Sequence, residues 1–217
     1  MRKVFQQKMI KRSMLIISAL YSCFVTSYLY ANKPVGYVLD IQMTPAICLL
    51  DTSKVKKRKC MEGYTLNIEG LYPETSRTNC TTATSATLPP LQAKVVARVM
   101  PDEAARRQLW AAVGGCTGTN ASQYFRTVIN YAERLKIPSV MTGQETKQIH
   151  TVSLQTMFIR LNKGLSANSI RFQCMKYRNT TYLTSLNVCY SPNGQYKACS
   201  NKVVSNCTGT FTIKGSY

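Results

Sequence analysis

Apolar residues recur at helical spacing most clearly between Asn120 and Leu135. Positions three and four residues apart share one face of a helix, and the apolar side chains of this stretch fall on one such face: Tyr124, Val128, Tyr131, Ala132 and Leu135. Asn120 or Ser122 is suited to cap the beginning, and Pro138 follows the end. The pattern predicts an amphipathic helix over 120–135 with its aromatic stripe in the core.

Shorter patterns predict the other elements. Met100-Pro101-Asp102-Glu103 marks a helix start, with proline in the first turn and acidic residues near the positive end of the helix dipole, and this helix should run towards Gly114. A second, shorter helix is expected over 153–161. Turn residues and β-forming runs predict strands over 37–42, 63–69, 169–177, 182–190 and 208–213, a turn at 70–73 and an irregular loop over 79–91.

Residues 1–31 have the layout of an export signal. Basic residues precede an apolar run from Met14 to Tyr30, and Ala31 marks a candidate cleavage point. Leu29 stands where a small residue is usual, so two other interpretations stay open: an uncleaved anchor, because the run is near the lower limit for spanning a bilayer, or lipidation at Cys23. Only these two would bring the protein to a membrane. We expect an exported protein, periplasmic or secreted, with one domain over 32–217.

The chain is strongly basic. It has 28 Lys and Arg against 9 Asp and Glu, a net charge of +19, and because five of the cations lie in the leader the remainder keeps +14. Such a balance attracts polyanions such as RNA, or it only keeps a basic protein soluble. A basic loop over 51–59 includes Lys56, Lys57 and Arg58, with no aromatic residue between them to stack on bases. This loop is either a solvated surface or an anion-binding patch.

Eight cysteines follow the leader, and an even number in an exported chain indicates a disulfide framework. Their spacing alone does not select one pairing. Zinc binding is the competing interpretation, and the export context and the absence of a C-x-x-C pattern disfavour it. We therefore expect neither a metal nor a cofactor.

Two segments carry motifs that agree in order. Residues 67–73 read N-I-E-G-L-Y-P and residues 108–116 read Q-L-W-A-A-V-G-G-C. They resemble the T-I-H-G-L-W-P and H-E-W-x-K-H-G-T-C motifs of the ribonuclease T2 family, the secreted acid ribonucleases. The strand before Pro45 and Cys48, and the helix over 120–135, resemble the corresponding family segments too, so the likeness covers about residues 35–213.

The resemblance implies an α+β fold, in which an antiparallel β-sheet has helices packed on one side and disulfides staple the chain. By analogy with the family's cysteines, it also implies four pairs: Cys48–Cys60, Cys80–Cys116, Cys174–Cys207 and Cys189–Cys199.

In the family, the two motifs supply the histidines, glutamate and lysine that convert the RNA phosphodiester to a 2′,3′-cyclic phosphate. Carried over position by position, these five residues are replaced by Glu69, Gln108, Leu109, Ala112 and Val113. Loss of general acid–base assistance costs about 10² to 10⁴ in rate for each group, and loss of a cationic stabiliser costs a comparable factor. The resemblance therefore predicts a pseudoenzyme with at most residual cleavage.

Binding is a separate question from cleavage. Tyr72 and Glu74 stand where family members hold a base, so a base could stack on Tyr72 and hydrogen-bond to Glu74. The alternative is that Tyr72 only packs against its own motif. We expect Trp110 in the core, and His150, the only histidine, in a surface or capping role.

Three functions stay open at this point. The first is an inactive ribonuclease T2-like protein that binds RNA or another polyanion through its basic surface and the former cleft, including Gln108, Lys56, Lys57 and Arg58. The second is a protein-interaction module, such as an inhibitor, an immunity-like factor or an envelope factor, with an exported protein partner. The third is an endoribonuclease with a rearranged active site.

Overall fold

The computed structural model describes residues 33–51, 53 and 58–216. Pro34–Tyr217 forms one compact unit. The predicted leader, with its cleavage, anchoring or lipidation, lies outside the described residues. The elements follow the order β1 (Gly36–Met43), α2 (Thr44–Leu50), α3 (Arg58–Met61), β2 (Leu66–Glu74), α4 (Pro90–Ala97), α5 (Glu103–Val113), η2 (Gly114–Cys116), α6 (Ala121–Arg134), η3 (Ser139–Met141), β3 (Lys147–His150), α7 (Thr151–Leu161), η4 (Ala167–Ser169), β4 (Ile170–Tyr177), β5 (Thr180–Tyr190) and β6 (Thr210–Ile213).

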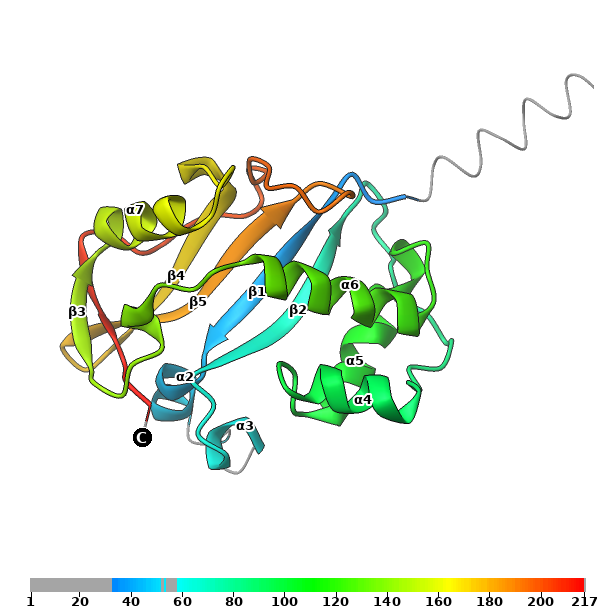
Figure 1. The fold of residues 1–217 in the computed structure, drawn as a ribbon, viewed down its shortest axis with the longest axis horizontal. Helices are drawn as coiled ribbons and strands as arrows, with labels where there is room; N and C mark the ends of the chain where they lie inside the picture. Colours follow the sequence, from blue (N-terminus) through cyan, green and yellow to red (C-terminus); the bar gives the residue numbers. More distant parts are fainter. Residues whose placement is uncertain (1–32, 52, 54–57, 217) are drawn as a thin grey trace, which may run out of the picture. The chain divides into compact units, whose positions relative to one another are not determined.

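The strands form one six-stranded sheet in the order β2-β1-β5-β6-β3, with β4 pairing with β5. Neighbouring strands are antiparallel, except that β5 and β6 run parallel where Tyr182 pairs with Thr212. Helix α6 crosses β1 and β2, and α7 lies beside β4 (Figure 1). The predicted α+β fold, with a sheet and helices on one side, is confirmed, and the parallel β5–β6 contact is an addition to it.

Alternation along β1 separates the two faces of the sheet, because successive side chains of a strand point to opposite sides. Leu39, Ile41 and Met43 are buried in the hydrophobic core. Asp40 and Gln42, between them, are only half-buried and belong to the opposite face. The aromatic stripe of α6 packs into the core as predicted; the Tyr131 ring, for example, meets the Tyr37 ring edge-on at 5.9 Å between centroids.

The predicted turn at 70–73 is wrong. β2 continues to Glu74, and these four residues pair with β1, from Gly70 opposite Asp40 to Pro73 opposite Tyr37. Because β2 is an edge strand, proline is tolerated there without breaking a central ladder. The irregularity lies one residue earlier, where a bulge leaves Glu69 without a partner on β1. A bulge re-aims side chains locally.

The helices follow the predictions with small shifts. α5 begins at Glu103, because the side chain of Asp102 caps it by accepting from the Ala105 N–H at 3.1 Å, so Pro101 lies before the cap and not in the first turn. α6 matches the predicted helix and begins at a capping box formed by Asn120 and Gln123.

α7 begins two residues earlier than predicted, and the His150 Nδ1 caps it by accepting from the Val152 N–H at 3.3 Å, in agreement with the expected capping role. The short helices α2, α3 and α4 and the strand β3 were not predicted; α4 takes up the last two residues of the predicted 79–91 loop.

All four predicted disulfides form: Cys48–Cys60, Cys80–Cys116, Cys174–Cys207 and Cys189–Cys199. Trp110 is buried as predicted, and its Nε1 donates to the Thr84 carbonyl at 3.1 Å. In the part of the chain that the structure describes, no helix is long and apolar enough to cross a membrane.

Candidate functional site

A pocket opens between the β2 bulge, the start of α5 and the short helix α3. Its volume is about 230 Å³, and its lining consists of Lys59, Asn67, Ile68, Glu69, Met100, Asp102, Ala104, Ala105 and Gln108. Glu69 comes from the first motif and Gln108 from the second. The fold therefore brings the two motif segments to one site.

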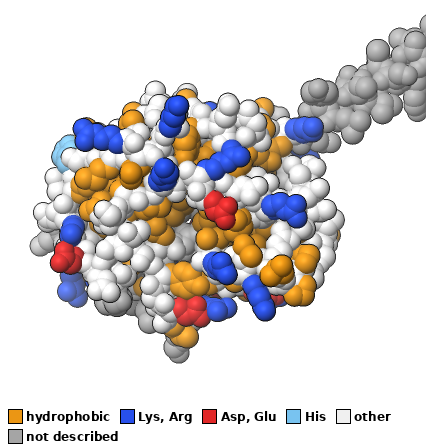
Figure 2. All heavy atoms as spheres, viewed as in Figure 1, with side chains coloured by type: hydrophobic (Ala, Val, Ile, Leu, Met, Phe, Trp, Pro, Cys, Tyr) orange, Lys and Arg blue, Asp and Glu red, His pale blue; other side chains and the backbone are white. Residues whose placement is uncertain are grey.

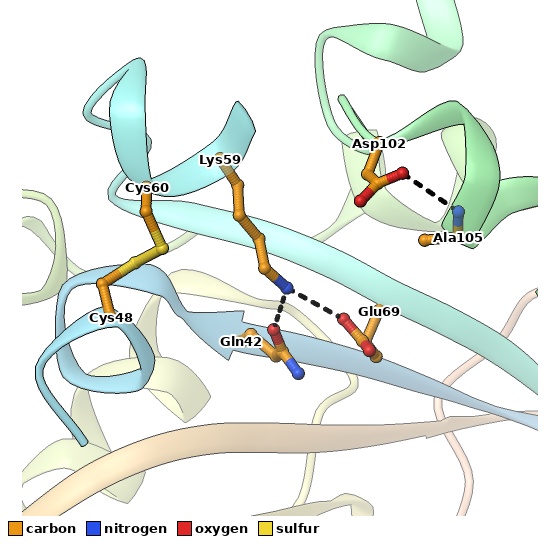
Figure 3. A network of polar contacts seen from close by, with 7 residues as sticks. All are labelled: Gln42, Cys48, Lys59, Cys60, Glu69, Asp102 and Ala105. Atoms are coloured by element: carbon orange, nitrogen blue, oxygen red, sulfur yellow. Dashed lines mark hydrogen bonds and ion pairs between the residues drawn. A yellow bond between two sulfur atoms is a disulfide. The ribbon is translucent and has the colours of Figure 1, made fainter. Parts of the chain in front are cut away.

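Lys59 dominates the polar contacts of this pocket. Its Nζ donates to Gln42 Oε1 at 2.6 Å and lies 3.3 Å from Glu69 Oε2 (Figure 3). The Lys59 side chain is only 10% exposed, against 37% for Glu69. A buried ammonium group needs an ion-pair partner and hydrogen-bond acceptors, and Glu69 and Gln42 provide them for Lys59. The adjacent Cys48–Cys60 disulfide ties α3 to α2 and so helps to hold Lys59 in place.

A second carboxyl group, Asp40, lies on the same face of the sheet. Burial raises the pKa of Asp40 to about 6, the negative charge of Glu69 adds to the shift, and the side chains of Ser185 and Asn187 oppose it. Its Oδ1 atom is buried and has no hydrogen-bond partner among the described residues. This face of the sheet is therefore rich in carboxyl groups, and one of them changes charge near pH 6.

The other positions that the resemblance assigns to the family's catalytic residues, Leu109, Ala112 and Val113, do not line the pocket and carry no ionisable group. Leu109 and Val113 are buried in the core, and Ala112 is exposed. Gly70 lies close to Leu109 and Tyr72: a Cβ atom there would lie 2.9 Å from Leu109 Cδ1 and 3.0 Å from the Tyr72 ring. The close approach of these side chains explains why glycine occupies position 70.

The two residues predicted to hold a base, Tyr72 and Glu74, have different surroundings. Tyr72 is 38% exposed, and burial together with the nearby charges of Asp40 and Glu69 raises the pKa of its hydroxyl to about 12, which keeps it protonated. Glu74 is mostly buried and forms an ion pair with Lys197.

The basic loop is seen only in part. The exposed Arg58 side chain, at the start of α3, pairs at 2.5 Å with Glu62, which follows the end of this helix. Lys56 and Lys57 lie outside the described residues, so their predicted role in binding stays a prediction.

Sequence reasoning missed four polar residues of the site: Asp40, Gln42, Lys59 and Asp102. Two of them left a signal, because Asp40 and Gln42 alternate with apolar residues along β1 and so had to share its polar face. Lys59 was counted with the cations of an exposed loop, whereas it is 8% exposed. Among the described residues, no cluster of three or more His, Cys, Asp and Glu could hold a metal ion.

Comparison with known proteins supports the fold. No family model matches the sequence, and no curated protein matches it. RNase MC1 from the seeds of bitter gourd has a TM-score of 0.64 at 15% identity, over 81% of this chain and 98% of that chain. A mutant of RNase MC1 in complex with 5′-UMP gives the same TM-score at 14% identity, over 82% and 98%.

Two further solved structures have the same fold. The RNase-related protein from Calystegia sepium has a TM-score of 0.62 at 13% identity, over 84% of this chain and 98% of that chain. The Japanese pear S3-RNase has a TM-score of 0.57 at 16% identity, over 84% and 99%. This chain therefore has the ribonuclease T2-like fold. The likeness implied by the two motifs is confirmed at the level of the fold.

Proposed function

We propose that this protein is an exported ribonuclease T2-like protein, periplasmic or secreted, that does not cleave RNA but binds RNA or another polyanion. The observation that carries the loss of cleavage is the ion pair between the buried Lys59 and the half-buried Glu69, at the position that corresponds to the first catalytic histidine. A histidine at this position would exchange protons near neutral pH, whereas Glu69 is a carboxylate that is already paired with Lys59.

The pocket has the wrong charge for phosphodiester cleavage. That reaction needs a base, an acid and cations around the phosphate. Here Glu69 and Asp102 line the pocket against a single cation, Lys59, and the Lys59 ammonium is already engaged by Gln42 and Glu69. A phosphate group in this pocket would meet more negative than positive charge, so polyanion binding has to use other parts of the surface.

The surface supplies cations in excess. With 28 Lys and Arg against 9 Asp and Glu, most cations have no carboxylate to pair with. Neutralising phosphates with such side chains releases counterions, which drives binding of nucleic acids without sequence specificity. Tyr72 is exposed enough to stack on a base, whereas Glu74 would first have to leave Lys197. Tyr72 is thus the better candidate of the two.

A cleavage assay tests the first half of the proposal. The disulfide-bonded protein is incubated with RNA between pH 4 and 8, beside a Glu69→Gln variant and a Glu133→Gln control on the exposed surface of α6. We expect no turnover above background in any of the three. Turnover that survives purification, persists in the control and disappears in Glu69→Gln would establish a rearranged active site instead.

A salt titration tests the second half. Binding of a labelled single-stranded RNA is measured by fluorescence anisotropy at increasing salt concentration. We expect the logarithm of the association constant to fall linearly with the logarithm of the salt concentration, with a slope of about −0.7 for each phosphate neutralised. Absent or salt-independent binding would contradict polyanion binding.

A protein-interaction module is the second candidate, and α7 is the observation that favours it. Val152, Met157, Ile159 and Leu161 are all exposed on this helix, and exposed apolar surface of this kind often marks an interface. Capture of one exported protein after nuclease treatment, lost in a Met157→Glu variant and kept in Lys94→Glu, would support this function. If nuclease treatment abolishes the capture, RNA mediates it, and the result supports RNA binding instead.

A further inference from the structure

A second groove lies where the ends of α6 and α7 meet the loop after β5. Its volume is about 720 Å³, and it shares no lining residue with the Glu69 pocket. Three cations line it, Arg134, Lys136 and Lys163, together with the polar Asn162 and Gln195 and the aromatic Tyr196. None of its lining residues is acidic. In Figure 2, Lys and Arg side chains gather in this region, over α7 and the left-hand end of α6.

The three cations do not serve an ion pair. Among the described residues, none of them forms an ion pair with a carboxylate. Cations also stabilise helix C-termini, but the carbonyl groups here already have donors. Asn162 Nδ2 donates to the Phe158 and Lys136 carbonyls at 2.9 Å each. The lysine ammonium groups therefore remain available to a ligand.

The walls of the groove are fixed by hydrogen bonds. Asn162 is buried, and its Oδ1 accepts from the Lys136 N–H at 2.7 Å and from the Tyr196 hydroxyl at 3.2 Å. Arg134 Nη1 donates to the Gly194 carbonyl at 3.1 Å. Gly194 has a φ of +79°, and a Cβ atom there would lie 2.5 Å from Arg134 Nη1. A groove that is ordered before binding loses less entropy when a ligand arrives.

We propose that this groove binds the phosphate backbone of single-stranded RNA, with Arg134, Lys136 and Lys163 contacting phosphates and Tyr196 offering its ring to a base. This inference rests on the proposed function, because it locates the polyanion binding claimed there. Tyr196 is half-buried, and its ring packs against that of Tyr190 with 5.1 Å between centroids. An aromatic ring beside cations favours a nucleic acid over a sulfated glycan, since bases stack on such rings.

The test compares two pairs of substitutions that change the net charge equally. Lys136→Glu with Lys163→Glu alters the groove, and Lys94→Glu with Lys176→Glu alters exposed lysines outside it. The full-length, disulfide-bonded protein is titrated against a fluorescein-labelled oligouridylate RNA at several salt concentrations. We expect the groove variant to lose at least tenfold in affinity and the control less than threefold. The magnitude of the salt slope should fall by about 1.4 in the groove variant, about 0.7 for each lost phosphate contact.

The possible results of this titration separate the groove assignment from the proposed function. Equal losses in the two double variants would overturn the groove while leaving polyanion binding intact. A wild-type protein that does not bind the RNA would refute the proposed function, and the groove assignment with it. If heparin binding depends on the two groove lysines and RNA binding does not, the assignment to RNA is wrong. Lys136→Gln with Lys163→Gln, checked by circular dichroism, replaces the glutamate pair if that pair does not fold.

Discussion

Replacing Asp40 by asparagine should stabilise the protein near neutral pH and change little in acid. Asp40 lies on β1 with one oxygen buried and without a hydrogen-bond partner among the described residues. Burial and the neighbouring Glu69 raise its pKa from 3.8 to about 6. Asparagine has nearly the same shape and carries no charge, so the variant removes the free-energy cost of ionising a buried carboxyl group in the folded protein.

The pH window follows from the two pKa values. Below pH 3.8 the carboxyl group is protonated in both states and ionisation costs nothing. Between pH 3.8 and about 6 the folded state binds more protons than the unfolded state, so the free energy of unfolding falls as the pH rises. Above about pH 6 the loss is complete. A shift of about two units corresponds to roughly 3 kcal/mol, and because Asp40 keeps some contact with solvent we expect about 1 to 3 kcal/mol.

Urea denaturation of the disulfide-bonded protein measures this effect. Trp110 is the only tryptophan and is buried, so its fluorescence reports on unfolding. The free energy of unfolding is determined at pH 4 and pH 8 for the wild type, for Asp40→Asn and for the exposed control Glu133→Gln. We expect a gain for Asp40→Asn at pH 8 that is mostly lost at pH 4. A difference of equal size at both pH values, or a loss at pH 8, would refute the reasoning.

Three further predictions use the same denaturation assay. Replacing both Cys80 and Cys116 by serine opens a loop of 36 residues and should lower the free energy of unfolding by about 4 kcal/mol; an unchanged value would contradict this. Tyr124→Phe removes the hydroxyl that bonds the Leu71 N–H and carbonyl, so we expect a loss of about 1 to 3 kcal/mol, not a gain. Gly194→Ala places a side chain at a φ of +79° and should lower stability by at least about 1 kcal/mol; a neutral result would exclude strain there.

Local signals predicted the parts of the fold that depend on local interactions. α6 is an example, because the helical spacing of its apolar residues and its capping residue, Asn120, can both be recognised within one short stretch of sequence. Residues 70–73 show the opposite case. A glycine and a proline three residues apart are typical of a turn, but pairing with β1, a contact between distant segments, keeps them extended. α4 was missed because only Val96 of its eight residues is buried, so it has almost no apolar stripe to detect.

The candidate site divides in the same way. The resemblance to the two ribonuclease T2 motifs placed Glu69 and Gln108 at one site, and both line the pocket. The role of Lys59 was beyond prediction, because a run of cations indicates a solvated loop. Its burial depends on contacts with Gln42 on β1 and Glu69 on β2, which are distant in the sequence. The partners of Lys59, Gln42 and Glu69, lie far away in the sequence, and no residue next to Lys59 reveals them.

The packing of Leu109 and Val113 bears on the evolution of this chain. Both side chains are part of the apolar core, and Leu109 also fits against Gly70 and the Tyr72 ring. Under the proposed loss of cleavage, a return of ionisable residues at these positions would bury polar groups without partners, which destabilises a protein by several kcal/mol. Activity would come back only after several such changes together. The first such change would therefore give a less stable protein without restoring activity. The fold thus favours the evolution of new binding functions over recovery of RNA cleavage.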